Sequence, residues 1–585
     1  MKISDFEAPF IQKEAKASDF GIMPGKEIPA TLLQQAIDAC KANQINRLIF
    51  EPATYDIYIE KSIILEDMDH FEISGNGAMF RFFSPITHLN TILYFKILNC
   101  SHIKFSNLFI DWDWERAPLA SLVQVEKRTE DFVDFRYMED RNLPDTSLFI
   151  TLNQVNNETF TPGVENGTEY IGPKRFSEEP FFKREKIEDK LYRCYLDKST
   201  LDDRYFRVGS YYLVRHFVYN GGCFSIVDTN HFIFENVTVY SVPGFGVHIS
   251  GHSHHILFDR FKITLPDFEK RYISATVDGV HVTRSNGYIL FENCDLGYQG
   301  DDCINIHVWV EMGVEKLSSN TFKYKNTKYS SDRVGEKLEF RNSDLSPTGF
   351  SATITEIFEQ DGYSVVKLDK EIPDTILPDS VIFNRSYDSG NYEIRNSYFH
   401  ETRARGILAQ ADNGIIENCT FYRIQGAAIQ IETGASRLWS EGMGVENLTI
   451  RNNKIKECDI NDWDKGVLYM STFLPAGIPI QNTKHPNPTT TVGDSGADFR
   501  TAYPMFKNIT IENNVFEEYP RRAMILTSFD GVHLKNNTFI NNIPRNYNNP
   551  ERGSIWAALG KNLTDENNTF VESPYMMMPG IENDM

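Results

Sequence analysis

Three acidic residues have the types and the spacing to perform acid and base chemistry together. Asp301 and Asp302 are adjacent in the stretch "YQGDDCINIH", and Asp278 precedes Asp301 by 23 residues in "TVDGVHV". Carboxyl groups held close to one another raise each other's pKa, so one can stay protonated near neutral pH while another is ionised. Hydrolysis of a glycosidic bond needs an acid and a base of this kind. The pattern therefore predicts an active site for sugar cleavage.

Adjacent residues of a regular strand point to opposite faces, so Asp301 and Asp302 can share a cleft only if this segment is bulged or turned. Gly300 permits such a bend. Other polar and aromatic side chains near the acids are candidates for binding sugar hydroxyls or stacking on a sugar ring: His248, His281, Asn305, His307, Arg403, Arg405, Glu432, Trp439 and Glu441.

Each of these features also has a simpler explanation. The Gly-Asp-Asp segment could be a solvated turn or a calcium site. A histidine in a strand is more often structural than catalytic, and Trp439 could pack under a loop. The stretch "DWDWERAP" (111–118) repeats the pairing of Trp with carboxylates, but a capped surface turn accounts for it equally well.

The acids lie within a repeat in which short apolar segments are interrupted by Asn, as in "HFIFENVTVY" and "NITIENNVF". Some of these Asn residues are 22 or 23 residues apart, and repeats of 20 to 50 residues are typical of solenoids and propellers. The pattern includes Asn236, Asn293, Asn396, Asn418, Asn452, Asn513 and Asn536, with Arg260 at an equivalent position.

This repeat predicts an all-β fold, a right-handed parallel β-helix. Asn tolerates the left-handed backbone of a bend, and a stacked Asn column can satisfy its own amides. A leucine-rich repeat would need a regular Leu ladder, and a propeller would need four strands per ~40 residues. Counting back 15 residues from Asn293 reaches Asp278, and one repeat further reaches Asp301. The same count elsewhere gives Gly221, Phe245 and Arg403. We therefore expect these residues to lie near Asp278 and Asp301, at equivalent positions on successive turns that are ~4.8 Å apart.

One long helix is expected near the start, in "PATLLQQAIDACKAN", followed by a strand and tight turn in "RLIFEPATYDIY". Two tracts without the Asn repeat have alternating apolar residues, which indicates small antiparallel β-barrel-like insertions. The predicted organisation is a cap with the first turns of the β-helix (1–117), insertion 1 (118–215), catalytic turns (216–310), insertion 2 (311–388) and C-terminal turns (389–585).

Charge and composition limit the partners. The chain has 59 basic and 81 acidic residues, a net charge of −22 with no basic block, which argues against nucleic acid and anionic membranes and favours a neutral glycan. The eight cysteines lack metal-binding spacing and are expected to be buried apolar residues. No apolar segment reaches the ~18 residues of a membrane span. Without a signal-peptide core, we expect a cytoplasmic protein, or a periplasmic or secreted one whose leader has been removed; a homodimer is left open.

Taken together, these motifs resemble the pectin-lyase-like β-helix superfamily. "LLQQAIDAC" and "LIFEPATYDI" are similar to its capping helix and first strand, although Glu51 and Ala53 depart from the usual Pro-Pro-Gly-Thr-Tyr. "DGVHV" with "GDDCINIH" is similar to polygalacturonases of glycoside hydrolase family 28, but their downstream Gly-His-Gly and Arg-Ile-Lys motifs are missing. The better match is glycoside hydrolase family 110, which it resembles over nearly the whole chain, including "RARGIL" and the Trp-Ser-Glu segment.

That family consists of inverting exo-acting α-1,3-galactosidases that act on blood-group-B-type and related glycans. The resemblance implies that Asp301 is the general acid, that Asp278 and Asp302 hold and activate water, and that no metal or cofactor takes part. Inversion typically needs carboxyl groups ~6.5 to 9.5 Å apart, so acid and base would have to be offset rather than directly stacked. A uronate-cleaving hydrolase or lyase and a non-catalytic glycan-binding β-helix are the alternatives.

Overall fold

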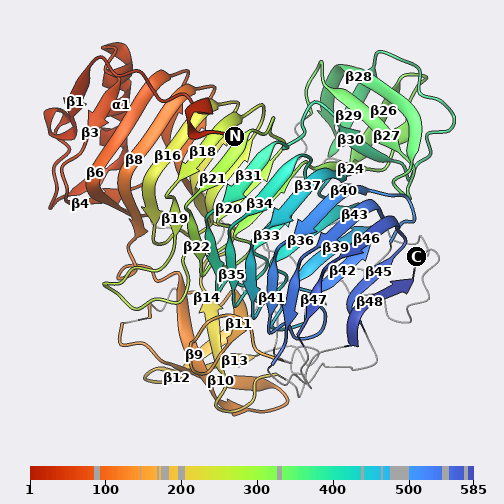
Figure 1. The fold of residues 1–585 in the computed structure, drawn as a ribbon. Coiled ribbons are helices and arrows are strands. Elements are labelled where there is room, and N and C mark those ends of the chain that lie inside the picture. Colours follow the sequence, from red (N-terminus) through yellow and green to blue (C-terminus); the bar gives the residue numbers. More distant parts are fainter. Residues whose placement is uncertain are drawn as a thin grey trace.

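The protein is a long parallel β-helix that carries two separate antiparallel insertions (Figure 1). Within the part that the computed structural model describes, α1 (Ala30–Ala42) is the one α-helix and nearly everything else is strand or turn. The described residues are 1–84, 92–141, 143–144, 147–165, 167, 170–172, 183–195, 205–325, 332–435, 440–462, 466–474, 500–542, 553–571 and 578–584.

One face of the β-helix is a twelve-stranded parallel sheet in the described residues, and it carries the predicted site. Its strands pair with one another across successive turns of the chain, as a solenoid requires. They are β5 (Ile63–Glu66), β7 (Ile92–Leu98), β15 (Gly221–Val227), β17 (Phe245–Ser250), β20 (Val280–Thr283), β23 (Ile304–His307), β33 (Ile407–Ala409), β36 (Ile429–Gly434), β39 (Leu468–Phe473), β42 (Met524–Thr527), β45 (Gly553–Ala558) and β48 (Met578–Asp584).

The other two faces form one continuous sheet, because the long strands β6 (Asp69–Phe83), β8 (Ser101–Trp112) and β16 (Asn230–Val239) pass through both. Its strands are β1 (Glu14–Lys16), β2 (Glu27–Pro29), β3 (Arg47–Ile49), β4 (Thr54–Tyr58), β6 (Asp69–Phe83), β8 (Ser101–Trp112), β16 (Asn230–Val239), β18 (His254–Asp259), β19 (Lys262–Ile263), β21 (Ile289–Glu292), β22 (Asp295–Gly297), β31 (Tyr392–Arg395), β32 (Tyr398–His400), β34 (Gly414–Glu417), β35 (Thr420–Tyr422), β37 (Val445–Arg451), β38 (Lys454–Lys456), β40 (Phe506–Glu512), β41 (Val515–Glu517), β43 (Phe529–Lys535), β44 (Thr538–Ile540), β46 (Lys561–Glu566) and β47 (Thr569–Phe570).

The repeated Asn residues make the bend between these two faces. All seven of them, and Arg260, have φ between 53° and 57°, in the left-handed region that Asn tolerates best among non-glycine residues. The next residue along builds a buried amide ladder, in which Asn453 donates to Asn514 (3.0 Å), Asn514 to Asn537 (3.1 Å) and Asn537 to Asn568 (2.9 Å). The predicted bend is therefore confirmed, and the amide ladder runs one residue further on.

The interior of the solenoid is apolar and stacked in columns. Phe258 lies parallel to Phe291 with ring centroids 4.4 Å apart, and Phe539 repeats this with Phe570 at 4.6 Å. All eight cysteines are buried and unpaired, as predicted. Because each turn covers the apolar surface of the next, the stack needs a cap where it begins.

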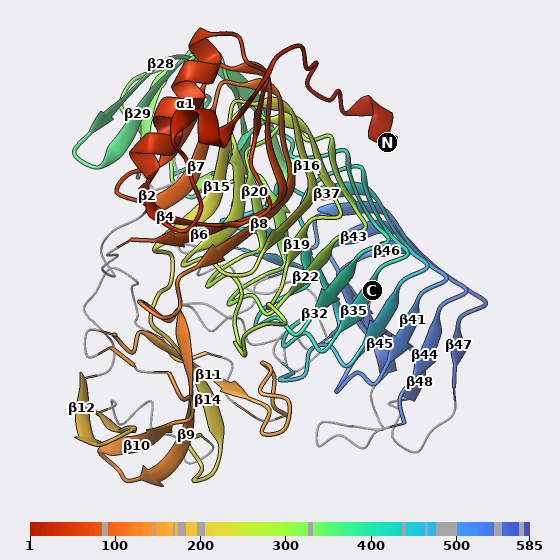
Figure 2. The same cartoon turned by 90° about the vertical axis from the view of Figure 1, so that its left-hand side faces the viewer.

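Helix α1 supplies that cap at the N-terminal end (Figure 2). Leu33, Ala36, Ile37 and Cys40 are buried against the first strands, which confirms the helix predicted from their spacing. The carboxylate of Glu60 accepts the backbone N–H groups of Ala30 (3.1 Å) and Thr31 (3.0 Å), so a negative charge sits at the helix N-terminus, where it is favourable. No helix in the described residues is both long and apolar enough to span a bilayer.

The two insertions are antiparallel sheets with their own apolar cores. Insertion 1 has six strands in the described residues: β9 (Ala120–Arg128), β10 (Phe132–Tyr137), β11 (Thr151–Val155), β12 (Lys183–Glu188), β13 (Leu191–Tyr195) and β14 (Tyr211–Arg215). Insertion 2 has seven: β24 (Val310–Met312), β25 (Glu315–Lys316), β26 (Thr321–Lys325), β27 (Lys337–Arg341), β28 (Pro347–Gln360), β29 (Tyr363–Leu368) and β30 (Val381–Asn384).

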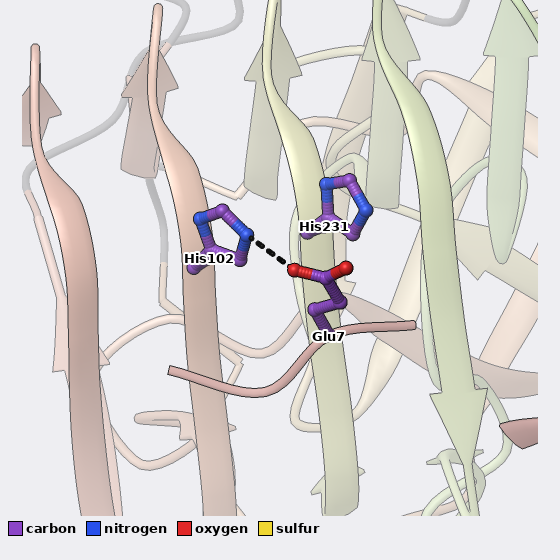
Figure 3. A group of neighbouring side chains, drawn as sticks. All are labelled: Glu7, His102 and His231. Carbon is purple, nitrogen blue, oxygen red and sulfur yellow. Dashed lines mark hydrogen bonds and ion pairs between the residues drawn. The ribbon is translucent and has the colours of Figure 1, made fainter. Parts of the chain in front are cut away.

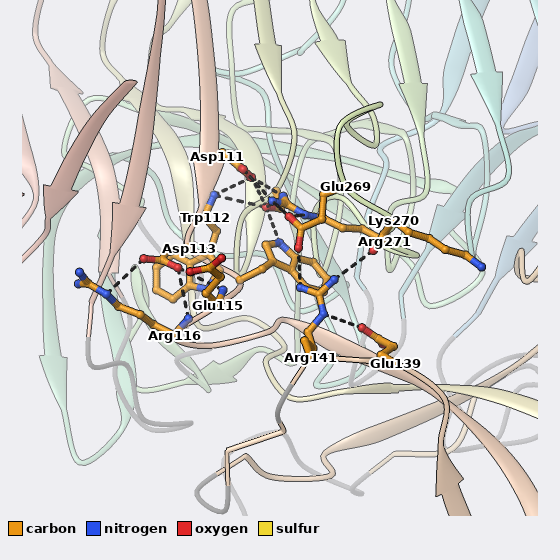
Figure 4. A network of polar contacts seen from close by, with 12 residues as sticks. Asp111, Trp112, Asp113, Glu115, Arg116, Glu139, Arg141, Glu269, Lys270 and Arg271 are labelled. Carbon is orange, nitrogen blue, oxygen red and sulfur yellow. Dashed lines mark hydrogen bonds and ion pairs between the residues drawn. The ribbon is translucent and has the colours of Figure 1, made fainter. Parts of the chain in front are cut away.

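A buried ion-pair network joins insertion 1 to the β-helix (Figure 4). Arg271 binds both oxygens of Asp111, at 2.6 and 2.9 Å, and its guanidinium lies over the ring of Trp114. On the other side of the network, Arg141 of the insertion contacts Glu269 at 2.8 Å. A sugar platform in "DWDWERAP" is wrong, because Trp112 and Trp114 are buried. Their indole N–H groups already donate within the protein, so the segment is a capped turn.

Candidate active site

The three acids lie in the turns that lead into neighbouring strands of the twelve-stranded sheet. Asp278 precedes β20, and Asp301 with Asp302 precedes β23. Residues 298–303 are not part of a strand, so the alternation of side chains along a strand does not apply to the pair. One carboxylate oxygen from each of the three acids lies within 4.8 Å of the others. The carboxylates of Asp301 and Asp302 therefore lie close together, and the carboxylate of Asp278 lies beside them.

The register differs by one residue from the sequence count. Val280 pairs with Ile304, so the residue stacked on Asp278 is Asp302, and Asp301 lies beside this column. On the following turn Ile304 pairs with Ile407, which places Arg405 in the column where the count gave Arg403. Turns of the β-helix differ in length, so a count from the Asn bend reaches the neighbourhood but not the exact residue.

Gly300 is required by lack of space rather than by its backbone angle. A Cβ atom at this position would lie 2.3 Å from the carbonyl oxygen of Thr276 and 2.4 Å from Nη1 of Arg215. The left-handed residue of this turn is Tyr298, with φ of 64°. The absence of a side chain at residue 300 lets the two acid-bearing turns approach each other closely.

Each acid has a different set of partners. Asp301 forms an ion pair with Arg403 and accepts a hydrogen bond from the hydroxyl of Tyr219 at 3.3 Å. Asp302 accepts the backbone N–H of Arg405 at 2.8 Å. Asp278 contacts Nδ1 of the neighbouring histidine on strand β20 at 2.5 Å. The acids are thus held in separate environments although they lie close together.

These environments decide where protons stay. Burial raises the pKa of Asp278 well above its ordinary value, and repulsion from Asp301 raises it further. Burial also raises the pKa of Asp302 well above normal, and the other two carboxylates add to this effect. Both shifts favour retention of a proton on the buried side of the cluster. Burial lowers the pKa of His281, so that imidazole is neutral beside Asp278.

The predicted sugar-binding residues on the sheet contact one another. The rings of His248 and His281 stack with centroids 5.6 Å apart on adjacent strands. Asn305 donates to Glu441 at 3.1 Å and bonds Nδ1 of His307 at 3.0 Å. Burial raises the pKa of Glu441 and lowers that of His248 to about 3.

The remaining predicted residues extend this set along the next turns. Arg405 donates from Nε to the amide oxygen of Gln430 at 3.1 Å, and Gln430 in turn donates to Glu432. Arg403 reaches Asp301 from the same turn as Arg405. Trp439 lies outside the described residues, so its predicted stacking role stays a prediction.

Sequence reasoning missed three residues that come from insertion 1 and the segment after it. Arg215 is fully buried and donates to the carbonyl oxygens of Thr276 (2.7 Å) and Gly300 (3.0 Å), which ties together the two acid-bearing turns. Burial lowers the pKa of Arg215 to about 10. The ring of Tyr170 lies under the guanidinium groups of Arg215 and Arg403, at 5.3 and 5.0 Å. Tyr219 is the third, and no repeat or motif marks any of them in the sequence.

Comparison with known proteins places this site in context. The family described as "Right handed beta helix region" matches residues 383–492, in agreement with the predicted fold. Among solved structures, the family 28 exopolygalacturonase of Yersinia enterocolitica is 12% identical with a TM-score of 0.43, over 97% of this chain and 78% of that chain.

The curated relatives match far more of the chain than the family match to residues 383–492 does. Alpha-1,3-galactosidase B of Bacteroides thetaiotaomicron is 25% identical over 90% of this chain and 86% of its own length. Alpha-1,3-galactosidase A of Bacteroides fragilis is 23% identical over 89% of this chain and 86% of its own length. These relatives confirm the predicted resemblance and the prediction of a glycosidase.

Proposed function

We propose that this β-helix glycosidase is an exo-acting α-1,3-galactosidase that removes terminal α-1,3-linked galactose from glycans with inversion. The observation that carries the proposal is the convergence of Asp278, Asp301 and Asp302 to within 4.8 Å in a chain whose relatives bear that name. Blood-group-B-like branched glycans and linear α-galactosides are the two proposed substrate groups.

Asp301 is proposed as the general acid because it is the most accessible of the three. Its side chain is 18% exposed, against 6% for Asp278 and 6% for Asp302. The acid must reach the glycosidic oxygen of a substrate that enters from solvent, whereas the water is best held on the buried side of the cluster. The two buried carboxylates are proposed to orient that water and to take its proton.

The proton for Asp301 is proposed to come from within the cluster. In the free protein Arg403 pairs with Asp301, while burial keeps a proton on Asp278 or Asp302. Transfer of that proton to Asp301 as the sugar binds would create the acid and the base in one step, since the donor is left as a carboxylate. No group from outside the chain is needed to balance the transfer.

The stereochemical part of the proposal rests on the resemblance to glycoside hydrolase family 110. Oxygens within 4.8 Å of one another are closer than the ~6.5 to 9.5 Å typical of inverting enzymes, and nearer to the ~5 to 5.5 Å of retaining ones. Inversion therefore requires the reacting water to enter beside the three acids rather than between two opposed carboxylates.

Recognition of galactose is proposed to use the polar side chains beside the acids. Asn305, His307 and Glu441 are linked by contacts of 3.0 to 3.5 Å, which fixes their orientations in advance of binding. Nε2 of His307 is buried and has no hydrogen-bond partner in the described protein. His248, His281, Arg405 and Glu432 would supply further contacts to hydroxyl groups.

Incubation with a panel of α-1,3-, α-1,4- and α-1,6-galactosides and galacturonans, followed by proton NMR, tests the reaction. We expect galactose only from α-1,3-linked substrates, with β-galactose as the first anomer. Initial α-galactose would contradict inversion. Turnover of galacturonans would favour the uronate-cleaving alternative, and tight binding without release would favour the non-catalytic one.

A comparison of leaving groups tests the roles of the acids. Loss of a general acid typically costs ~10²- to 10⁴-fold, and an activated aryl leaving group needs less protonation. Asp301→Asn should therefore lose much more activity on an α-1,3-galactobiose than on an aryl α-galactoside. Asp278→Asn and Asp302→Asn should lose activity on both substrates, because each removes a carboxylate proposed to hold and deprotonate the water.

The matched control is Asp361→Asn, at an exposed turn far along the chain in insertion 2, which should retain activity on both substrates. Its φ of 51° is one that Asn adopts readily. If Asp278→Asn or Asp302→Asn showed the leaving-group dependence instead, the acid role would pass to that buried residue.

A further inference from the structure

A column of histidines runs along the outside of the first turns of the β-helix. His70, His102, His231 and His255 occupy equivalent positions on successive turns, each with φ between 52° and 55°. Neighbouring imidazoles stack with centroids 4.2, 4.9 and 4.8 Å apart. Further along, the same position is taken by Asn residues such as Asn413. Stacking alone does not require histidine, so the concentration of imidazoles at one end needs another reason.

An acidic residue from the N-terminal segment lies against two of these imidazoles (Figure 3). Phe6 is 4% exposed and packs among Ile233, Leu257 and Leu290 on the outer face of the sheet. This anchor holds Glu7 with its Oε2 3.3 Å from Nε2 of His102. One ligand atom each from Glu7, His102 and His231 lies within 4.8 Å of the other two.

The hydrogen bonds on the far side of the rings fix their orientation. Asp69 can only accept when ionised, and its Oδ1 lies 2.9 Å from Nδ1 of His102, so Nδ1 is the donor. In the same way, Nδ1 of His231 lies 2.8 Å from the side-chain oxygen of Asn230. In the neutral imidazoles the lone pair is therefore on Nε2. Nε2 of His102 then faces a carboxylate oxygen, so two acceptors oppose each other unless a metal ion or a proton lies between them.

We infer that Glu7, His102 and His231 bind a divalent transition-metal ion, with Zn²⁺ the best match to the donor set. Two imidazoles and one carboxylate with an open fourth position are a ligand set that zinc prefers, while calcium and magnesium prefer oxygen alone. Asp69 then acts as the carboxylate that orients a metal-binding histidine. His70 is not part of the set, because its Nδ1 accepts the backbone N–H of Phe10 at 3.0 Å.

The groups must draw together to bind one ion, and the stacked rings of His102 and His231 must tilt so that both Nε2 lone pairs point at it. Ligands at ~2.0 to 2.2 Å from a zinc ion lie at most roughly 4 Å from one another. The spacing of up to 4.8 Å therefore closes by about an ångström through side-chain rotation, which half-buried rings and an exposed Glu7 allow. The bound ion would fasten the N-terminal segment to two turns of the β-helix.

Isothermal titration of the chelator-treated full-length protein with ZnCl₂ and with CaCl₂ tests this site. His102→Asn and His231→Asn remove a ligand yet suit the backbone, because Asn already occupies this column on later turns. His255→Asn is the matched control, since His255 lies in the column but outside the ligand group. Glu7→Gln removes the carboxylate charge, and Asp69→Asn tests the orienting role.

We expect the native protein to bind one equivalent of zinc. His102→Asn and His231→Asn should lower the zinc affinity by roughly tenfold or more, and Asp69→Asn should lower it by ~10- to 100-fold. His255→Asn should leave the zinc affinity unchanged. Calcium should not compete for this site. Zinc held by the three catalytic acids would survive in His231→Asn and is thereby distinguished. Absence of zinc binding in the native protein, or equal binding in His231→Asn, would overturn the inference and leave an imidazolium–carboxylate ion pair in its place.

Discussion

Replacement of Gly300 by Ala should damage both the fold and the activity of this protein, because the added methyl has no room. Its Cβ would meet the Thr276 carbonyl oxygen at 2.3 Å and the guanidinium of Arg215 at 2.4 Å. Overpacking of a rigid site costs ~1 to 3 kcal/mol. Relief of the clash must push Arg215 out of its hydrogen bonds to residues 276 and 300, or shift the turn that carries Asp301.

A shift of about an ångström in a catalytic group can cost ~10²-fold in rate. We therefore expect Gly300→Ala to lower the free energy of unfolding, measured in urea, by ~1 to 3 kcal/mol. We also expect it to lower kcat/KM on an α-1,3-galactoside by ~10²-fold. Gly466→Ala is the matched control, because its Cβ would meet nothing closer than 3.3 Å and its φ is not left-handed. A Gly300→Ala protein with native stability and native kcat/KM would refute the argument that close approach of the two turns builds the site.

Three further outcomes are expected. Asp302→Asn should raise Tm at pH 7.5 but not at pH 4. The pKa of Asp302 is higher in the folded protein than in the unfolded chain, so its ionisation destabilises the fold increasingly as pH rises above ~4. A constant difference in Tm at both pH values would contradict this reasoning. Arg271→Met should cost ~3 to 5 kcal/mol in urea unfolding, since it leaves Asp111 buried without its partner. Arg116→Ala, which removes a half-exposed ion pair, should cost under ~1 kcal/mol, and equal losses would refute the distinction. Asn514→Leu should cost ~1 to 3 kcal/mol for each ladder group left without a partner, measured by the same unfolding, and a neutral effect would show that the ladder is dispensable.

Much of the fold could be predicted because it depends on local properties of the chain. A left-handed bend favours Asn, so Asn236 and its counterparts mark most turns, and Arg260 takes that position on one of them. The spacing of Leu33, Ala36 and Cys40 predicts the capping helix for the same reason, since apolar periodicity reports which face is covered. The period, the strands between bends and the position of the acids all follow from these local features.

The details of the site could not be predicted from the same features. The count from the bends stacked Asp278 on Asp301, whereas the strand pairing stacks it on Asp302. The network around Trp114 shows the same limit. Its neighbours in the sequence include Asp and Arg residues, which favour an exposed position, but in the structure Trp114 is buried and Arg271 covers its ring. Burial of this kind depends on segments more than a hundred residues away.

The sequence by itself determined a solenoid with a recurring left-handed bend, usually at Asn, and three acids on neighbouring turns. It did so because backbone bending and apolar periodicity are properties of a few adjacent residues. Only the tertiary structure decided which acid is stacked on Asp278 and which is paired with Arg403. It also decided that Arg215, at the end of insertion 1, and Tyr219, in the segment after it, enter the site. The physical reason is that side-chain partners and burial, and through them the pKa of each carboxyl, are set by contacts across turns whose lengths vary and by chain segments that the repeat does not contain.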